Sequence, residues 1–123
     1  MKIVKWTDDR VYFSDGTYIT YDHLQDCCEY NYADFSVLDM MYHDEEFESY
    51  KIETVEEAGF LLKFYQDDGD KLIPYGRTGY LNIFIPCYSD QNGYYTSMLD
   101  IYCYDKDGEL VWKDSLDCER RIA

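Results

Sequence analysis

The chain has few cationic side chains for its length. Its 11 lysines and arginines stand against 26 aspartates and glutamates, which gives a formal net charge of −15. Nucleic acids and anionic membranes bind proteins through cationic surfaces, so this balance argues against direct binding to either. The charge suits a basic protein partner, because opposite charges steer association. It is also typical of a protein that is simply kept in solution by self-repulsion, so charge alone leaves both interpretations open.

We also expect no segment that would target the chain for secretion or anchor it in a membrane. No apolar run approaches the ~20 residues that a membrane-spanning helix needs. Residues Met1–Trp6 lead straight into acidic residues without the apolar stretch of a secretory signal. The five cysteines are an odd number, and none forms a Cys-x-x-Cys pair. We therefore expect a cytoplasmic protein with reduced thiols.

The sequence contains no recognisable catalytic motif. It has no P-loop, no dinucleotide-binding glycine pattern and no Gly-x-Ser-x-Gly elbow. Residues 67–70 form a short acidic turn and lack the twelve-residue pattern of a calcium loop. Cys27 or Cys28 could pair with a histidine, but the acidic surroundings would oppose a thiolate. We expect no enzymatic activity and no catalytic residues.

A metal site would have to involve Cys27 and Cys28, with His23 four residues before the first of them. Neighbouring side chains on an extended chain point in opposite directions, so only one cysteine would readily face an ion together with His23. Buried free cysteines that act as small apolar residues are the more usual outcome. We predict no resident metal and no cofactor, and this cluster remains the open alternative.

Composition favours one folded unit rich in strands. The chain has 123 residues, of which 46% are hydrophobic and 19% aromatic, so it can bury one core and we expect one domain over residues 1–123. The expected fold class is α+β, a mostly antiparallel β meander sheet with one short helix packed on it. Alternating runs bounded by turn signals place the strands at residues 2–6, 10–13, 17–21, 50–53, 59–66, 80–88, 94–104 and 109–113, followed by a tail that frays.

The expected helix lies within residues 30–42. Tyr32, Phe35, Leu38 and Met41 recur there at helical spacing. An amphipathic helix of this length would lay its apolar face on the sheet.

A tight turn is predicted at Asn92-Gly93, because both residues tolerate the positive φ angles of a two-residue type I′ turn. The runs 80–88 and 94–104 would then pair as the arms of a hairpin. Side chains alternate along a strand, so the arms have one aliphatic face, expected in the core, and one face rich in tyrosine. The tyrosine face either packs under the helix or is an exposed recognition surface.

Two strings carry a resemblance to a known family: Gln25-Asp26-Cys27-Cys28-Glu29 and Asn92-Gly93-Tyr94-Tyr95. From about residue 10 to 104 the chain resembles a family of small uncharacterised bacteriophage and bacterial proteins, a domain of unknown function. Its members read His-Asp-Cys-Cys-Glu and later Ser-Asn-Gly-Tyr-Tyr. Gln25 stands here in place of the family's histidine, which removes the best candidate metal ligand or base. The resemblance implies a phage or mobile-element origin and no particular activity.

A dense acidic stretch follows the expected helix, with eight carboxylates from Asp39 to Glu57 against the single Lys51. Spaced carboxylates can imitate a row of phosphates and fill a groove lined with lysine and arginine, although any solvated loop also looks acidic. We expect a DNA mimic that inhibits a basic, nucleic-acid-handling host defence protein, such as a CRISPR nuclease, by occluding its groove. The candidate contact residues are Asp44, Glu45, Glu46, Glu48, Glu53, Glu56, Glu57, Asp67, Asp68 and Asp70.

The alternative is a non-enzymatic binding module that uses the tyrosine face for self-association or ligand sensing. Its candidate contact residues are Tyr94 and Tyr102. Such binding would survive high salt, whereas contacts between surface charges are screened. An open strand edge near residues 109–113 would support a homodimer. Neither hypothesis involves direct contact with nucleic acid or with a membrane.

Overall fold

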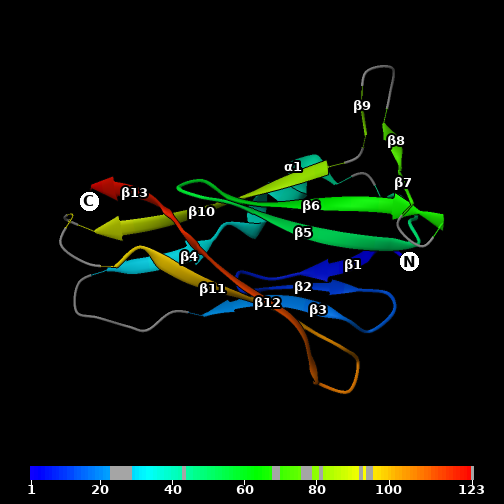
Figure 1. Cartoon of the computed structure of the whole chain (residues 1–123), viewed down its shortest axis with the longest axis horizontal. Helices are drawn as coiled ribbons and strands as arrows, with labels where there is room; N and C mark the ends of the chain where they lie inside the picture. The colour runs from blue at the N-terminus through cyan, green and yellow to red at the C-terminus, as the bar shows by residue number, and fades with distance from the viewer. Residues whose placement is uncertain are drawn as a thin grey trace.

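The structure is a computed structural model that describes residues 1–22, 29–42, 44–67, 70–75, 79–80, 82–91, 93 and 96–122. Two mostly antiparallel sheets face each other, with one short helix at the side (Figure 1). The predicted α+β class, with mainly antiparallel strands and a short packed helix, is confirmed.

The first sheet has five antiparallel strands in the order β1-β2-β3-β11-β12. They are β1 (Ile3–Trp6), β2 (Arg10–Phe13), β3 (Tyr18–Asp22), β11 (Met98–Tyr104) and β12 (Leu110–Asp117).

The second sheet follows the order β13-β10-β6-β5 and has two further short strands at its sides. Its members are β4 (Tyr30–Ala33), β5 (Ser49–Val55), β6 (Gly59–Gln66), β7 (Lys71–Leu72), β10 (Asn82–Gln91) and β13 (Glu119–Ile122). β4 pairs with β10 and β7 with β6, while β13 runs parallel to β10. A separate two-stranded ladder joins β8 (Pro74–Tyr75) to β9 (Gly79–Tyr80).

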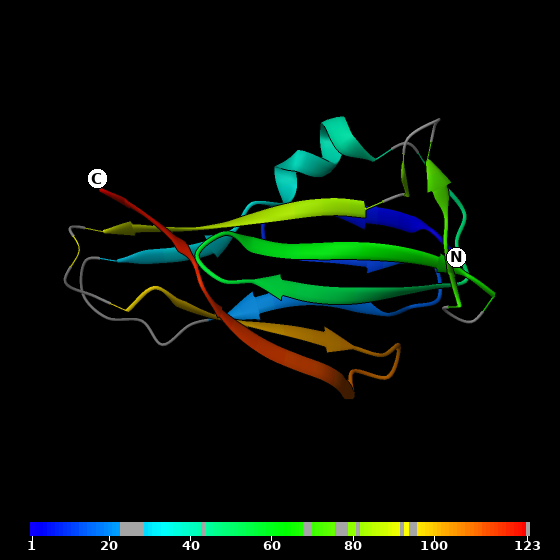
Figure 2. The same ribbon diagram turned by 45° about the horizontal axis from the view of Figure 1, so that its top comes forward.

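The core lies between the sheets, because each central strand buries every second side chain. In β10 the odd-numbered residues from Ile83 to Gln91 are buried and the even-numbered residues lie toward the outer face. In β11 the buried positions are Leu99, Ile101 and Cys103. Figure 2 shows the two layers from the side, with β5, β6 and β10 above β3, β11 and β12.

The helical segment is shorter than predicted. A single 3-10 turn, η1 (Phe35–Val37), leads into the helix α1 (Leu38–Met41), and Asp34 caps the turn by accepting a hydrogen bond from the Ser36 N–H at 3.1 Å. Phe35 and Leu38 are buried in the core, so the helix does pack on the sheets. The helical prediction for residues 30–33 is wrong, because these residues form β4, whose burial alternates with the two-residue period of a strand.

The predicted hairpin is also wrong. β10 pairs with β4, β6 and β13, whereas β11 pairs with β3 and β12, so the two arms belong to different sheets. The chain crosses between the layers after Gln91. Thr96 and Ser97 precede β11. The Thr96 carbonyl accepts a hydrogen bond from the Asn31 side chain on β4, and the Ser97 carbonyl accepts one from the N–H of Cys118, between β12 and β13. Those contacts take the place of the direct pairing that a two-residue turn would impose.

The tail does not fray. β13 adds to the side of β10 in parallel, with Tyr88 opposite Glu119 and Gln91 opposite Ile122. Arg121 from this strand forms an ion pair with Asp90 on the outer face of β10 at 2.9 Å. Backbone pairing and this surface contact together hold residues 119–122 on the second sheet.

Candidate functional site

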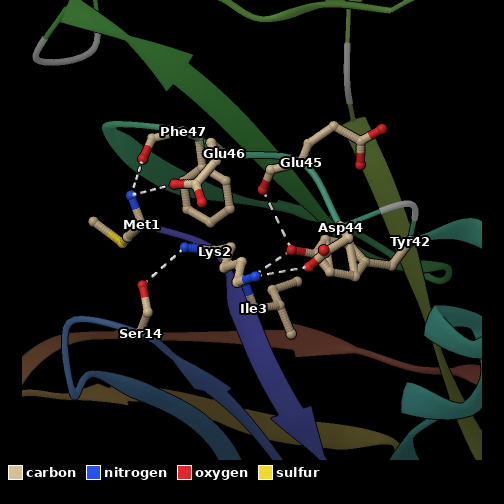
Figure 3. A network of polar contacts seen from close by, with 9 residues as sticks. All are labelled: Met1, Lys2, Ile3, Ser14, Tyr42, Asp44, Glu45, Glu46 and Phe47. Atoms are coloured by element: carbon tan, nitrogen blue, oxygen red, sulfur yellow. Dashed lines mark hydrogen bonds and ion pairs between the residues drawn. The ribbon is translucent and has the colours of Figure 1, made fainter.

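The predicted acidic segment is held firmly at the end of the molecule that carries the N-terminus. The backbone N–H of Phe47 donates to the Met1 carbonyl at 2.8 Å, and the amino group of Met1 donates back to the Phe47 carbonyl (Figure 3). The Phe47 ring is buried against Phe64 at a centroid separation of 4.5 Å. The carboxylates beside Phe47 are therefore presented from a fixed backbone.

Asp44, Glu45 and Glu46 differ from one another in their exposure to solvent and in the groups they contact. Asp44 forms an ion pair with Lys2 at 3.3 Å, and Glu46, whose side chain is 76% exposed, lies 3.8 Å from the amino group of Met1. Glu45 is half-buried, and its carbonyl accepts a hydrogen bond from Tyr42 at 3.3 Å. The Tyr42 hydroxyl also accepts from the N–H of Ile3, while burial raises the pKa of Tyr42 to about 12. Tyr42 thus acts as a neutral bridge between the acidic segment and β1.

A pocket of about 290 Å³ lies at the end of the molecule that carries the N-terminus. We call this pocket the acidic notch; it is lined by Met1, Glu46, Phe47, Glu48, Gln66 and Asp67. The backbone of Glu48 is fixed here because its N–H donates to the Tyr65 carbonyl at 2.9 Å, and its side chain is exposed. Asp70 is exposed and lies next to the notch, since its N–H donates to the Asp67 carbonyl. Carboxylates from two separated stretches of sequence thus surround one small hollow.

The other predicted acidic residues do not join the notch. Glu53 lies on the outer face of β5 and is ion-paired with Lys63. Glu56 and Glu57 form the turn after β5, and the Glu56 carboxylate accepts a hydrogen bond from the Asp117 N–H at 2.9 Å. At ~3.3 Å per strand residue, the length of β5 separates this turn from Glu48 by roughly 25 Å. Asp68 lies outside the described residues.

The tyrosines of the predicted recognition face do not lie on one surface either. Tyr102 lies on the outer face of the five-stranded sheet in a continuous row with Tyr104, Tyr18 and Tyr12, which we call the tyrosine ladder. Neighbouring ring centroids in the row are 5.3 to 6.1 Å apart. Tyr88 lies instead on the outer face of the second sheet, and Tyr94 is outside the described residues.

Basic side chains lie on the ladder although the protein as a whole is acidic. The nitrogen of Lys5 is 5.8 Å from the Tyr12 ring centroid, the guanidinium carbon of Arg10 is 5.0 Å from Tyr18, and Lys113 is 5.5 Å from Tyr102. These contacts were not among the sequence predictions. Alternation within β2 and β3 already places Tyr12 and Tyr18 outward, but only the long-range pairing of β3 with β11 brings them beside Tyr104.

The cysteine and histidine cluster is not placed by the structure, because His23, Cys27, Cys28 and His43 lie outside the described residues. Among the residues that are described, no group of three potential metal ligands comes together. Cys87, Cys103 and Cys118 are free and buried, which confirms for these three the prediction of small apolar cysteines. The hydrogen-bonded neighbour Cys118, together with burial, holds the pKa of the Cys87 thiol well above its ordinary value.

Comparison with other proteins adds no assignment. No protein-family model, curated protein or solved structure matches the chain. No helix in the described part of the chain is long and apolar enough to cross a membrane. The candidate sites are therefore defined by their own geometry.

Proposed function

We propose that this protein is a non-enzymatic inhibitor that binds a basic, nucleic-acid-handling host protein through the acidic notch. The convergence of Glu46, Glu48 and Asp67 around one pocket carries this proposal. A lysine or arginine side chain from the partner would enter the notch and meet carboxylates on more than one side. The partner's nucleic-acid groove would then be occupied by this chain.

The charge of the whole protein also favours a cationic partner. With a net charge of −15, the protein attracts a cationic groove at long range and repels the nucleic acid that competes for it. The resemblance to phage and bacterial proteins suggests the cytoplasm of an infected bacterium as the setting and a CRISPR nuclease as one target. The proposed contact includes only part of the predicted acidic residues, because Glu53, Glu56 and Glu57 lie away from the notch.

The first prediction is that reversing the charge of the notch abolishes inhibition. In the triple variant Glu46→Lys, Glu48→Lys, Asp67→Lys, we expect at least a tenfold loss of affinity, because each replacement puts a cation where the partner's cation should lie. The partner is first recovered from bacterial lysate on tagged wild-type protein and eluted in rising salt. Its displacement from a fluorescent DNA duplex by each variant is then measured by anisotropy.

A matched variant controls for net charge alone. Glu57, Asp107 and Glu109 are exposed in turns away from the notch, and changing all three to lysine gives the same change in net charge. This control should displace DNA within about twofold of wild type. Equal losses in both triple variants would show that only total charge matters, and no displacement by wild type would refute inhibition by groove occlusion.

The tyrosine ladder favours a second candidate function, self-association through the outer face of the five-stranded sheet. Aromatic rings and arginine are enriched at the centres of protein interfaces. Figure 2 shows the helix on the side of β10, away from β11 and β12, so it does not cover their outer face.

The second prediction is a dimer that persists at 1 M salt, where the Debye length falls to about 3 Å from about 8 Å under physiological conditions and surface charge contacts are screened. Tyr102→Ala and Tyr104→Ala should each shift it to monomer in sedimentation velocity, because each removes a ring from the row. Tyr88→Ala, on the outer face of the other sheet, is the matched control and should leave the dimer intact. A monomeric wild type at high protein concentration would exclude this candidate.

A further inference from the structure

The edge strands of the two sheets, β5 and β12, meet at one end and separate at the other. Thr54 donates to the Asp114 carboxylate at 3.2 Å, and the Glu57 N–H donates to the Asp117 carbonyl at 2.9 Å. Earlier along both strands, the facing residues leave a cavity of about 470 Å³. We call this cavity the wedge; its walls include Thr17, Tyr50, Ile52, Cys103, Val111 and Trp112.

The walls of the wedge are mainly apolar and aromatic. The Tyr50 ring is held rigidly, because its other face stacks on Phe13 with a centroid separation of 4.0 Å and an interplanar angle of 8°. Trp112 is half-buried on the opposite strand, and Val111 beside it is 57% exposed. Of the lining residues in the described part of the chain, Lys51 alone is charged. Its ammonium lies 4.9 Å from the Tyr65 ring on the outer face of the sheet.

One chain of hydrogen bonds enters the wedge, and its direction is fixed by its acidic end. The Thr17 hydroxyl donates to Asp15 at 2.7 Å, because a carboxylate can only accept. Thr17 must therefore accept from the Tyr50 hydroxyl, 3.0 Å away, and Tyr50 must accept from the Cys103 thiol at 3.1 Å. This leaves the Tyr50 oxygen one acceptor position for a donor in the wedge.

We propose that the wedge binds a small, uncharged, planar aromatic molecule that donates one hydrogen bond to the Tyr50 hydroxyl. A flat ring suits the space between two sheet edges, where the sheets themselves are ~10 Å apart. The volume lies within the range of small-molecule sites, which combine apolar walls with a few polar groups. An anion is disfavoured by the net charge of −15, and a cation would lose its hydration without gaining a carboxylate in the walls.

The third prediction is tested with 2-naphthol, which has two fused rings and one hydroxyl donor. The chain has two tryptophans, so the indole N–H signals of Trp6 and Trp112 can be followed together by NMR. Trp6 is bonded to Asp39 at 2.7 Å, outside the wedge, and serves as an internal control. Titration of wild-type protein should shift the Trp112 signal in a saturable manner and leave the Trp6 signal unchanged.

Two variants on the same strand complete the test. Ile52→Trp fills the wedge and should weaken naphthol binding at least tenfold, whereas Val55→Trp, on the exposed face of β5, should bind within twofold of wild type. Thermal melting confirms that each variant is folded, and Val111→Asp provides a second, surface-exposed change at the wedge that should weaken binding at least threefold. No Trp112 shift in wild type, unchanged binding in Ile52→Trp and Val111→Asp, or a Trp112 shift with tetramethylammonium alone would each overturn the proposal.

Discussion

Gly59→Ala is expected to destabilise the protein by about 4 kcal/mol, the range reserved for severe steric changes in a core. Gly59 begins β6 opposite Pro86 of β10. A Cβ atom there would lie 2.1 Å from the Ile85 carbonyl oxygen, 2.9 Å from the Pro86 Cα and 3.0 Å from the Cys87 nitrogen. All three atoms belong to the backbone of the central strand, so no side chain can rotate away and the two strands must separate. Urea denaturation followed by circular dichroism measures the loss.

Gly108→Ala is the matched control. Gly108 has a φ of +79°, and a Cβ atom placed on it would meet nothing within 4 Å. Its replacement carries only the penalty of a left-handed backbone, about 1 kcal/mol. Equal destabilisation by the two alanine variants would show that the close approach of β6 to β10 does not limit stability.

Two interior strands, β2 and β6, show what the sequence predicts well. The observed bounds of both strands, 10–13 and 59–66, agree with the prediction, because each run is rich in apolar and aromatic residues and ends at turn residues. The close approach of Gly59 to the backbone of β10 could not be predicted from the sequence. A glycine at a strand end is usually explained by a turn, whereas the close contact with β10 depends on a partner more than twenty residues away in the sequence.

Partner choice is where sequence reasoning failed. The pattern around Asn92-Gly93 satisfies the local rule for a hairpin, and both flanking strands exist. Pairing with β4 and β13 on one side, and with β3 and β12 on the other, nonetheless places the strands in different sheets. Local alternation identifies a buried face equally well in either arrangement, so it cannot distinguish a meander from two facing layers.

The candidate sites were predictable to different degrees. Charge density along the chain indicates Glu46 and Glu48 and, as a separate acidic group, Asp67. The pairing of β5 with β6 is what brings Asp67 beside the other two. The same density also indicated Glu53, which the structure pairs with Lys63 instead. The wedge had no signal in the sequence, because its walls come from strands that are adjacent only through long-range contacts.

A buried polar network centred on Asn31 of β4 links the end of β10 to the residues that begin β11. The Asn31 amide donates to the carbonyls of Thr96 and Met98 at 3.1 Å each, and its oxygen accepts from the Ser89 hydroxyl. Gln91 extends the network by donating to Ser89 at 2.6 Å and to Thr96 at 3.2 Å. Asn31 and Ser89 are fully buried, so every bond in the network replaces one to water.

Asn31→Ala is therefore expected to cost about 3 kcal/mol, because it leaves a buried hydroxyl and two carbonyls without this partner. Asn82→Ala, an exposed asparagine at the start of β10, is the matched control and should change stability by less than about 0.5 kcal/mol. Native-state hydrogen exchange gives a sharper readout than unfolding alone. If Asn31 fastens the start of β11 to the second sheet, its loss should lower protection at Leu99 more than at Leu62 of β6. Uniform loss of protection would mean that Asn31 contributes only to global stability and that other contacts direct the chain from one sheet to the other.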